Sequence, residues 1–476
     1  MAEEKKEKTK GQLLAEKLFL NLKNVWEDVD AETDKEIEKL ARSYMEFLDR
    51  GKTERECAEA VCEFLDKNGF VNIETLHREK PEAGRKVYRN IRGKSVIAAV
   101  IGNKPVDEGC NILGAHIDSP RLDLKQNPLY EDSDFALFDT HYYGGIKKYQ
   151  WTSIPLAMHG VFVNAEGKTI PVKIGEEPGD PVFTIPDLLP HLAKDQMQKK
   201  ASEAVEGEDL DILAGSRPYA DKEAKDKVKL NLLSLLYDKY GVTEKDFACA
   251  EIEFVPAFRA REIGFDRSMI GSYGHDDRCC AFPALRAIAA IAGEKTAPAK
   301  TAVCYLSDKE ETGSMGNTGA RSVNFENFFA ALCENEAGLR RCFLNSSMLS
   351  ADVNAAFDPT YAEVYDKRNS SYMGKGICLE KYTGSGGKYG ASDANAEFCF
   401  KVQEIMNKNK VRWQFGELGK VDKGGGGTIA LHAANYGIEV LDCGIPVLSM
   451  HSPFEVISKI DLYTTYRGYI AFLKDA

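Results

Sequence analysis

The stretch TAVCYLSDKEETGS at residues 301–314 changes character abruptly at Ser307. Residues 301–306 form an apolar run, which is typical of a buried strand. Directly after it come the adjacent carboxylates Glu310 and Glu311. Adjacent carboxylates repel each other, and neighbours along a strand point to opposite faces, so they cannot share one task. The two glutamates are therefore either solvated loop charges or groups that each have a partner of their own.

Similar apolar runs recur on both sides of this stretch. They are SVIAAVIG (95–102), NILGAH (111–116), SSMLSADV (346–353) and GIEVLDCG (437–444). After residue 270 they alternate with helical patterns, among them RCCAFPALRAIAAIAG (278–293) and a closing helix expected from about residue 454. Alternating strands and helices predict an α/β fold with a largely parallel sheet between helical layers.

Residues 126–260 have a different sequence pattern. Short strand patterns, LAMHGVFV (156–163) and TIPVKIG (169–175), are separated by the turn NAEGK. The polar stretch at 202–227 is expected to be a surface loop. Strands without intervening helices predict a β-rich insertion, so we expect a first domain part at 1–125, an inserted domain at 126–260 and a second part at 261–476.

Composition excludes several classes of protein. The 476 residues carry 62 Lys and Arg against 74 Asp and Glu, a net charge of −12, and no long basic block favours nucleic acid. The N-terminus lacks the pattern of a secretion signal, and no apolar run is long enough to cross a bilayer. Twelve scattered cysteines without a CxxC pair indicate reduced thiols and a cytoplasmic location. We expect the adjacent Cys279 and Cys280 to be packing residues.

Histidine and carboxylate side chains gather at predicted strand ends and helix starts. They are His116 and Asp118; His275, Asp276 and Asp277; Glu310 and Glu311; Asp352; and His451. Taken singly, an aspartate before a helix is most often a cap, and a lone histidine is most often structural. Because the carboxyl ends of parallel strands meet at one edge of a sheet, five such places indicate one shared site.

The residue types indicate metal chemistry. Imidazole and carboxylate ligands suit zinc and similar divalent ions. Two histidines and three carboxylates exceed the three protein ligands of one catalytic zinc, but suffice for two ions if one carboxylate bridges them. In the H-x-D pair, Asp118 can orient the ring of His116. One of the paired glutamates can then bind metal while the other accepts a proton.

These motifs in this order resemble those of the cocatalytic metallopeptidases. Five segments resemble specifically the M18, or aspartyl aminopeptidase, family, and the resemblance extends over nearly the whole chain. The segments are GAHIDSP, YGHDDRCCAF, SDKEETGSMG, SADVNAAFDP and MHSPFE. The resemblance implies a three-layer α/β/α metallopeptidase domain with a mostly parallel sheet. It also implies that a barrel-like, β-rich dimerisation domain interrupts it.

The resemblance also implies a role for each matching residue. Asp276 would bridge two divalent ions, most simply zinc, with cobalt or manganese as alternatives. His116 and Asp352 would complete one site, and Glu311 and His451 the other. Glu310 would be the general base and Asp118 the partner of His116.

Two further positions carry over from the family. His191 lies in a segment that resembles the one whose histidine reaches a neighbouring subunit's active site; the alternative is a helix-surface histidine. Lys381 lies where the family places a lysine near an acidic substrate side chain; the alternative is a solvated loop lysine. The sequence HDD departs from the usual family wording, so His275 and Asp277 are either additional ligands or simply neighbours.

The implied function is removal of N-terminal residues from peptides, with Asp or Glu as the favoured N-terminal residue. Rival interpretations are a related carboxypeptidase or amidohydrolase and a non-catalytic assembly protein. The family resemblance implies a homo-oligomer, a dodecamer built from dimers, and no nucleic-acid or membrane partner is expected.

The glycine-rich stretch VDKGGGGTIA at 421–430 lacks the phosphate-loop pattern, because Lys423 precedes the glycines. We expect close backbone approach beneath the site, or a flexible loop that contacts substrate. His77 and His432 are expected to be surface or helix-packing histidines.

Overall fold

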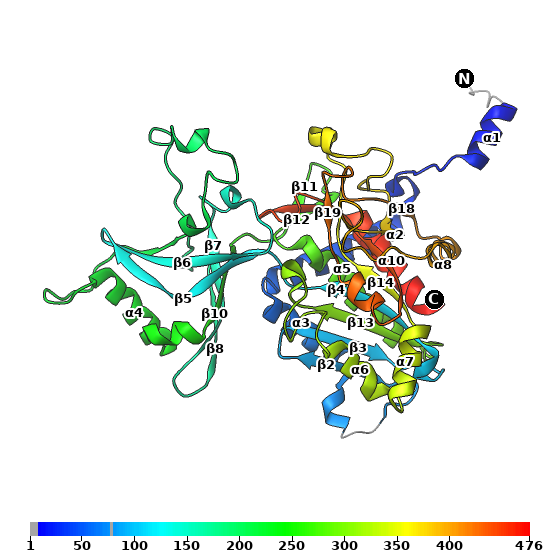
Figure 1. Ribbon diagram of the computed structural model, residues 1–476, viewed down its shortest axis with the longest axis horizontal. Helices are drawn as coiled ribbons and strands as arrows, with labels where there is room; N and C mark the ends of the chain where they lie inside the picture. Colours follow the sequence, from blue (N-terminus) through cyan, green and yellow to red (C-terminus); the bar gives the residue numbers. More distant parts are fainter. Residues whose placement is uncertain (1–7, 77–79) are drawn as a thin grey trace.

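The computed structural model describes residues 8–76 and 80–476, and His77 lies outside them. Figure 1 shows a large lobe built on one extended sheet and a smaller lobe that projects from it. The smaller lobe is formed by strands and one helix between residues 121 and 256. The chain leaves the large lobe after residue 116 and returns to it before residue 275.

The central sheet of the large lobe has nine strands in the described residues. In spatial order they are β1 (Val71–Asn72), β2 (Lys86–Ile91), β3 (Ser95–Val100), β13 (Thr301–Ser307), β4 (Cys110–His116), β14 (Ser347–Ala351), β20 (Glu439–Gly444), β16 (Ile377–Glu380) and β18 (Trp413–Phe415). The central strands β13, β4, β14 and β20 run parallel to one another, while β3 and β16 pair antiparallel on either side. The sheet is therefore mixed, with a parallel centre.

Register brings the ends of the central strands to one edge. Ser307 of β13 pairs with His116 of β4, and Ala351 of β14 pairs with Cys443 of β20. The residues that follow these strands consequently leave the sheet at the same place. This is the edge where open α/β sheets form their sites.

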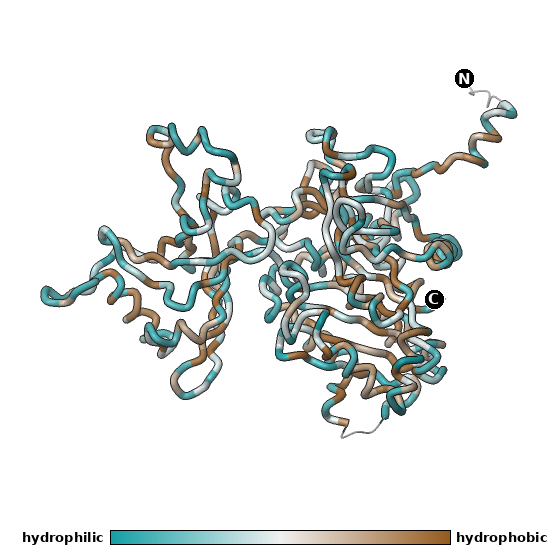
Figure 2. Tube along the Cα trace, viewed as in Figure 1, coloured by the Kyte–Doolittle hydropathy of each residue, from teal (hydrophilic) through white to brown (hydrophobic). Residues whose placement is uncertain are grey.

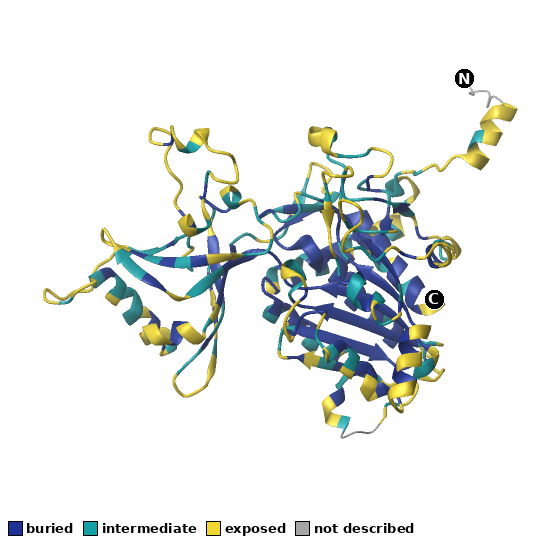
Figure 3. Ribbon diagram, viewed as in Figure 1, coloured by how far each residue is buried: buried dark blue, intermediate teal, exposed yellow. Residues whose placement is uncertain are grey.

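Helices cover both faces of this sheet. Side chains alternate along β3, so that Val96 and Ala98 enter one apolar core while Ile97 and Ala99 enter the other. The first face is covered by α2 (Ala31–Arg50), α3 (Glu54–Lys67), α5 (His275–Ala292), α8 (Ala396–Lys408) and α10 (Lys459–Asp475). The second is covered by α6 (Asn324–Leu332), α7 (Glu336–Asn345) and α9 (Ala430–Ala434), with His432 half-buried on α9. Figure 3 shows the strands between these layers almost wholly buried.

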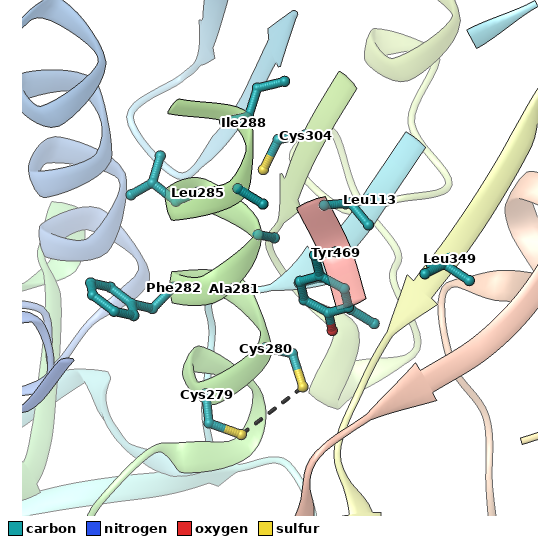
Figure 4. Close-up of a cluster of buried hydrophobic side chains, with 14 of the residues drawn as sticks. Leu113, Cys279, Cys280, Ala281, Phe282, Leu285, Ile288, Cys304, Leu349 and Tyr469 are labelled. Atoms are coloured by element: carbon teal, nitrogen blue, oxygen red, sulfur yellow. Dashed lines mark hydrogen bonds between the residues drawn. The ribbon is translucent and has the colours of Figure 1, made fainter. Parts of the chain in front are cut away.

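Helix α5 is buried along nearly its whole length. Figure 4 shows its Cys279, Cys280 and Phe282 side chains in the apolar core, with Tyr469 of α10 beside them. Both thiols are fully buried, and their sulfur atoms lie 4.0 Å apart. They line the core, as expected for packing residues. Because α5 is fixed by this packing, its first turn is held firmly against the edge of the sheet.

The smaller lobe is a six-stranded antiparallel sheet in the described residues. Its order is β8 (Thr169–Ile174), β7 (Leu156–Val163), β10 (Glu251–Pro256), β5 (Arg121–Asp132), β6 (Phe135–Tyr143) and β9 (Ile212–Gly215). Bridges from Phe183 to Leu156 and from Thr184 to Leu213 link its flanks at one end. Within the described residues, the six strands alone do not form a closed barrel, and only these isolated bridges join β7 to β9.

Two elements of the smaller lobe differ from the prediction. The polar stretch at 202–227 contains strand β9, which pairs with β6, rather than being a loop throughout. Helix α4 (Lys227–Tyr240) follows it and was not predicted. Only Val228 and Leu236 of α4 are buried. A helix that buries so few side chains needs no marked apolar face, so its sequence gives little indication of a helix.

The large lobe contains a second, five-stranded sheet in addition to the central one. Its order is β11 (Arg261–Ile263), β12 (Met269–Ser272), β22 (Glu455–Ser458), β21 (Pro446–Leu448) and β15 (Asn354–Ala355). The predicted closing helix from about residue 454 is wrong at its start, because residues 455–458 pair with β12 and α10 begins at Lys459. A separate two-stranded pair joins β17 (Gly384–Ser385) to β19 (Gly425–Gly426), and β19 belongs to the glycine-rich stretch.

The mixed α/β fold class predicted from sequence is confirmed. Near the N-terminus of the chain, α1 (Lys10–Leu18) projects away from the large lobe (Figure 1), and hydrophobic residues appear along this projecting segment in Figure 2. Leu13, Leu14 and Phe19 are exposed there. Within residues 8–76 and 80–476, every helix is too short or too polar to traverse a lipid bilayer.

Candidate metal centre

Asp276 lies between two histidines from distant parts of the chain. Its Oδ1 is 3.1 Å from Nε2 of His116, and its Oδ2 is 3.2 Å from Nε2 of His451. His116 ends β4, Asp276 is in the first turn of α5, and His451 follows β21. Each carboxylate oxygen therefore faces a different imidazole, which is the arrangement that a bridging ligand between two ions requires.

The remaining carboxylates complete the two sides of Asp276. Asp352, directly after β14, has an oxygen 3.8 Å from Nε2 of His116. Glu311 has an oxygen 3.4 Å from Nε2 of His451. His116 and Asp352 thus lie on one side of Asp276, and Glu311 and His451 on the other. The five residues named from sequence as metal ligands converge.

The paired glutamates belong to a 3₁₀ turn rather than to an extended strand. The turn spans Glu310–Thr312 and follows Lys309, whose φ of 64° ends the strand direction. Asp118 fixes this turn, because its two oxygens accept hydrogen bonds from the backbone N–H groups of Glu310 (3.1 Å) and Glu311 (3.3 Å). The turn separates the two side chains, so that Glu310 lies 3.9 Å from His116 and Glu311 lies near His451.

Asp118 also acts on His116. Nδ1 of His116 lies 3.3 Å from Oδ1 of Asp118 and 3.1 Å from its backbone carbonyl oxygen. Donation from Nδ1 leaves Nε2, the nitrogen that faces Asp276, free to accept. The hydroxyl of Tyr143 donates to Asp118 at 2.7 Å. The sequence did not single out Tyr143, which is supplied by the end of β6 in the smaller lobe.

His451 is oriented by two groups that sequence reasoning missed. Its Nδ1 lies 2.7 Å from the carbonyl oxygen of Gly145, so Nε2 faces Asp276 and Glu311. Its backbone N–H donates to Glu455 at 2.7 Å, and the backbone N–H of Asp276 donates to the other oxygen of Glu455 at 3.0 Å. Glu455 therefore joins the segments that carry two of the converging residues. It stands in MHSPFE, four residues after His451, and that proximity was the available signal.

The charged groups at the centre alter one another's pKa values. Burial, with the neighbouring charge of Asp276, raises the pKa of Glu311 well above its usual value. Burial also raises the pKa of Asp352, and it raises that of Glu310 to about 7. Burial opposes protonation of His116, yet its hydrogen bonds to Asp118 and Asp276 raise its pKa well above the usual value. Carboxylates crowded in this way favour a bound cation.

The donor set fits divalent metal ions. Oε1 of Glu311 is buried without a hydrogen-bond partner in the described residues, so it is available to a ligand. Ligand atoms of His116, Asp276 and Glu311 lie within 4.8 Å of one another, as do those of His116, Asp277 and Asp352. Two imidazoles with carboxylate oxygens are the ligands that zinc accepts.

His275 and Asp277 have different surroundings. The ring of His275 is fully buried and bonds to the hydroxyl of Tyr44 at 2.7 Å and to the carbonyl oxygen of Ile270 at 3.1 Å. Both its nitrogens are therefore engaged in the core. Asp277 accepts a hydrogen bond from the backbone N–H of His116 at 3.3 Å, which places it directly beneath the centre.

His191 and Lys381 do not join the centre within this chain. His191 is exposed on a turn of the smaller lobe, not on a helix. The Lys381 side chain is 44% exposed and pairs with Asp393 at 3.4 Å. Their proposed roles stay predictions.

Replacing Glu455 by glutamine is expected to weaken metal binding by about 10–100-fold, the usual effect of losing a group that orients ligands. The new amide would place N–H₂ against the backbone N–H of either Asp276 or His451. Competition with a chromogenic chelator measures the affinity. The half-buried Glu439, whose carboxylate accepts from the side chain of Asn395 instead, is changed in the same way as the control. Equal affinities in the two variants would contradict the role of Glu455.

The comparisons of this chain with known proteins all indicate the same family. The family model described as Aminopeptidase I zinc metalloprotease (M18) matches residues 47–473. The protein named probable M18 family aminopeptidase 1 of Clostridium acetobutylicum is 51% identical over 465 residues, which is 96% of this chain and 99% of the relative.

Solved structures agree with this match. An M18 aminopeptidase from Thermotoga maritima has a TM-score of 0.91 at 45% identity, covering 96% of this chain and 100% of the other. Aminopeptidase I from Clostridium acetobutylicum has a TM-score of 0.89 at 48% identity, with the same coverage. The S. cerevisiae mApe1 dodecamer, at 22% identity and a TM-score of 0.74, shares the fold.

Proposed function

The chain belongs to the M18 family of zinc aminopeptidases, and from this premise we propose that Asp276 bridges two divalent metal ions at the centre of its active site. His116 and Asp352 would hold one ion, and Glu311 and His451 the other. The observation that carries the proposal is the position of Asp276, whose two oxygens each face a different histidine.

Ions held by these residues would supply Lewis acidity, both for the scissile carbonyl and for lowering the pKa of a water molecule. We assign to Glu310 the role of accepting the proton of that water, because its carboxylate lies beside His116 and lines a cavity next to the metal centre. The same carboxyl can then give the proton to the departing amine. Asp118 keeps Glu310 in position through the backbone of the turn.

Two alternatives are disfavoured. A carboxypeptidase would need a free cation for the substrate's terminal carboxylate. Within the described residues no arginine lines the cavity at the centre, and its two lysines are directed to Asp393 and to the carbonyl oxygen of Glu363. A non-catalytic assembly protein would be expected to lack a ligand or the base. All the candidate ligands and Glu310 are present and converge.

The smaller lobe is proposed to be the inserted dimerisation domain, with the boundaries 126–260. Exposed apolar side chains gather on its segment around His191; they are Val182, Leu188, Leu189, Leu192 and Met197. Apolar patches of this kind are typical of interfaces between subunits. They support assembly into a homo-oligomer, a dodecamer built from dimers, in which His191 reaches a neighbouring active site.

Location and metal identity are also proposals. All twelve cysteines are free thiols in the described part of the chain, which supports a reducing, cytoplasmic environment. Zinc is proposed as the native metal, with cobalt and manganese as alternatives that tolerate the same ligands. The acidic N-terminal preference implied by Lys381 also stays a prediction.

Removal of the metal is expected to abolish hydrolysis of leucine 7-amido-4-methylcoumarin, and zinc, cobalt or manganese should restore it. The readout is fluorescence after dialysis against a chelator, with bound metal measured by atomic emission. A peptide with a free amine should be cleaved and its N-acetylated counterpart should not. Turnover of the acetylated peptide, or full activity without metal, would refute the proposal.

A further inference from the structure

The cavity beside the metal centre extends well beyond the converging ligands. It has a volume of about 470 Å³ and continues from Asp276 and Glu310 to a floor on β16 and β20. The glycine-rich stretch at residues 424–427 forms part of its wall. An aminopeptidase must seat the side chain of the N-terminal residue next to its metals. This cavity is the space that the fold provides for that side chain. The inference therefore rests on the proposed aminopeptidase function.

Strand β16 determines which of two neighbouring residues faces the cavity. Ile377 and Leu379 point into the apolar core on the opposite face of the sheet. Because side chains alternate along a strand, Glu380 points to the cavity, and it is among the residues that line it. Lys381, one residue later, is solvent-exposed and paired with Asp393. The acidic residue, not the basic one, forms the floor.

Glu380 has a second carboxylate beside it. Glu380 and Asp442 are direct partners in the pairing of β16 with β20, so their side chains lie side by side on the same face. Only 5% of Glu380 and 2% of Asp442 is exposed, and both line the cavity. Like charges directly opposite each other on a sheet are destabilising. A pair of this kind, kept on a cavity floor, favours an occupant that brings positive charge.

The polar neighbours of the two carboxylates are uncharged: the side chain of Asn354 lies beside Glu380, and those of Thr428 and Ser350 lie beside Asp442. Thr428 donates to Oδ1 of Asp442 at 2.6 Å, but Oδ2 is buried without a partner anywhere in residues 8–76 and 80–476. No ion pair in the described residues joins either carboxylate to a lysine, arginine or histidine. Burial, followed by the charge of Asp442, raises the pKa of Glu380 well above its usual value. The floor thus presents acceptors that a cationic group would satisfy.

The lysines that line the cavity do not neutralise this floor. Lys388 lies 3.0 Å from Asp393 and packs over the ring of Tyr382, with its nitrogen 3.6 Å from the ring centroid. Lys420 donates to the backbone carbonyl of Glu363 at 2.6 Å. Both ammonium groups are therefore directed to partners other than Glu380 and Asp442.

We propose that Glu380 and Asp442 form the subsite for the side chain of the substrate's N-terminal residue and that they select lysine or arginine over glutamate or aspartate. A lysine ammonium or arginine guanidinium can donate charge-assisted hydrogen bonds to both carboxylates. An acidic side chain would be desolvated against two acids and is rejected. This preference is opposite to the one that the family resemblance implies through Lys381.

The test is a substrate panel with the zinc-loaded full-length protein. The 7-amido-4-methylcoumarin derivatives of lysine, arginine, leucine and glutamate are compared by kcat/KM. Lysine and arginine are expected to exceed glutamate by at least tenfold. In Glu380→Gln the ratio of lysine to leucine should fall at least tenfold. Lys381→Ala, the adjacent outward-facing change, should leave that ratio as it is in the wild type.

A second measurement does not depend on any variant. Lysine amide and norleucine amide differ mainly in the ammonium group, and each can compete with the leucine substrate. Lysine amide is expected to inhibit at least tenfold more tightly. Equal inhibition by the two amides, or faster cleavage of glutamate than of lysine in the wild type, would overturn the inference.

The outcomes separate this inference from the proposed function. Metal-dependent cleavage of the leucine substrate without a cation preference overturns the inference alone. Loss of glutamate cleavage in Lys381→Ala, with no change in Glu380→Gln, would assign the subsite to Lys381 and overturn it as well. Absence of cleavage of every free-amine substrate would overturn the proposed function together with the inference.

Discussion

Glu310→Gln is expected to lower kcat by about 10²–10⁴-fold while leaving the bound metal in place. The amide has nearly the shape of the carboxylate but cannot accept the proton of the attacking water. The backbone of the turn should not move, because Asp118 bonds to the N–H groups of residues 310 and 311 and not to the Glu310 side chain. Steady-state kinetics with the leucine substrate, together with metal analysis of the same sample, measure both quantities.

The adjacent residue supplies a matched comparison. Glu311→Gln makes the same chemical change one position along, on a side chain that faces His451 and Asp276. It should lower metal affinity, and its activity should recover partly when zinc is added in excess. Glu310→Gln should not recover. If both variants lost metal alike, or if Glu310→Gln kept its rate, the separation of roles between the two glutamates would be refuted.

The strand ends of the centre could be predicted because they follow from short-range patterns. An apolar run that stops at a histidine or a carboxylate indicates a buried strand that delivers a polar group to its end. Parallel pairing of β13 with β4 then brings His116 and Glu310 together, although nearly 200 residues of sequence separate them. The fold class and the convergence of the ligands depend only on this rule.

What could not be predicted depends on register and on long-range pairing. Residues 455–458 read as the start of a helix because the apolar pattern continues into α10, and their pairing with β12 is not visible locally. The role of Glu455 depends on that pairing, since β22 carries its carboxylate to the backbone of Asp276.

The neighbours Glu380 and Lys381 illustrate the same limit of prediction from sequence, because they differ by only one position along the chain. A shift of one residue along a strand moves a side chain to the other face of the sheet. Sequence similarity to a family places a charged residue near the cavity, but only the register of β16 with β20 shows that the residue facing it is acidic. Substrate preference is therefore harder to predict from sequence than the metal centre.

Asp276→Asn is expected to have the largest effect of any single change in this chain. The asparagine side chain offers one oxygen and one N–H₂ group, so it cannot present a negatively charged oxygen to both histidines. The two metal sites, one beside His116 and one beside His451, should both bind zinc more weakly. Bound zinc should fall from about two ions per chain to less than one. Because metal ions supply several kcal/mol of transition-state stabilisation, kcat/KM should fall by at least about 10³-fold.

Asp277→Asn is the control for that variant, with the same change one residue along the first turn of α5. Asp277 accepts a hydrogen bond from the backbone N–H of His116, and an asparagine carbonyl can still accept it. Bound zinc should therefore stay near the wild-type amount. Loss of an ion would instead show that Asp277, which has an oxygen within 4.8 Å of ligand atoms of His116 and Asp352, is an additional ligand. Anomalous scattering from zinc-loaded crystals should show two peaks about 3.5–4 Å apart in the wild type and in Asp277→Asn. Two full peaks in Asp276→Asn would show that Asp276 does not bridge the ions, and the assignment of the whole centre would have to be abandoned.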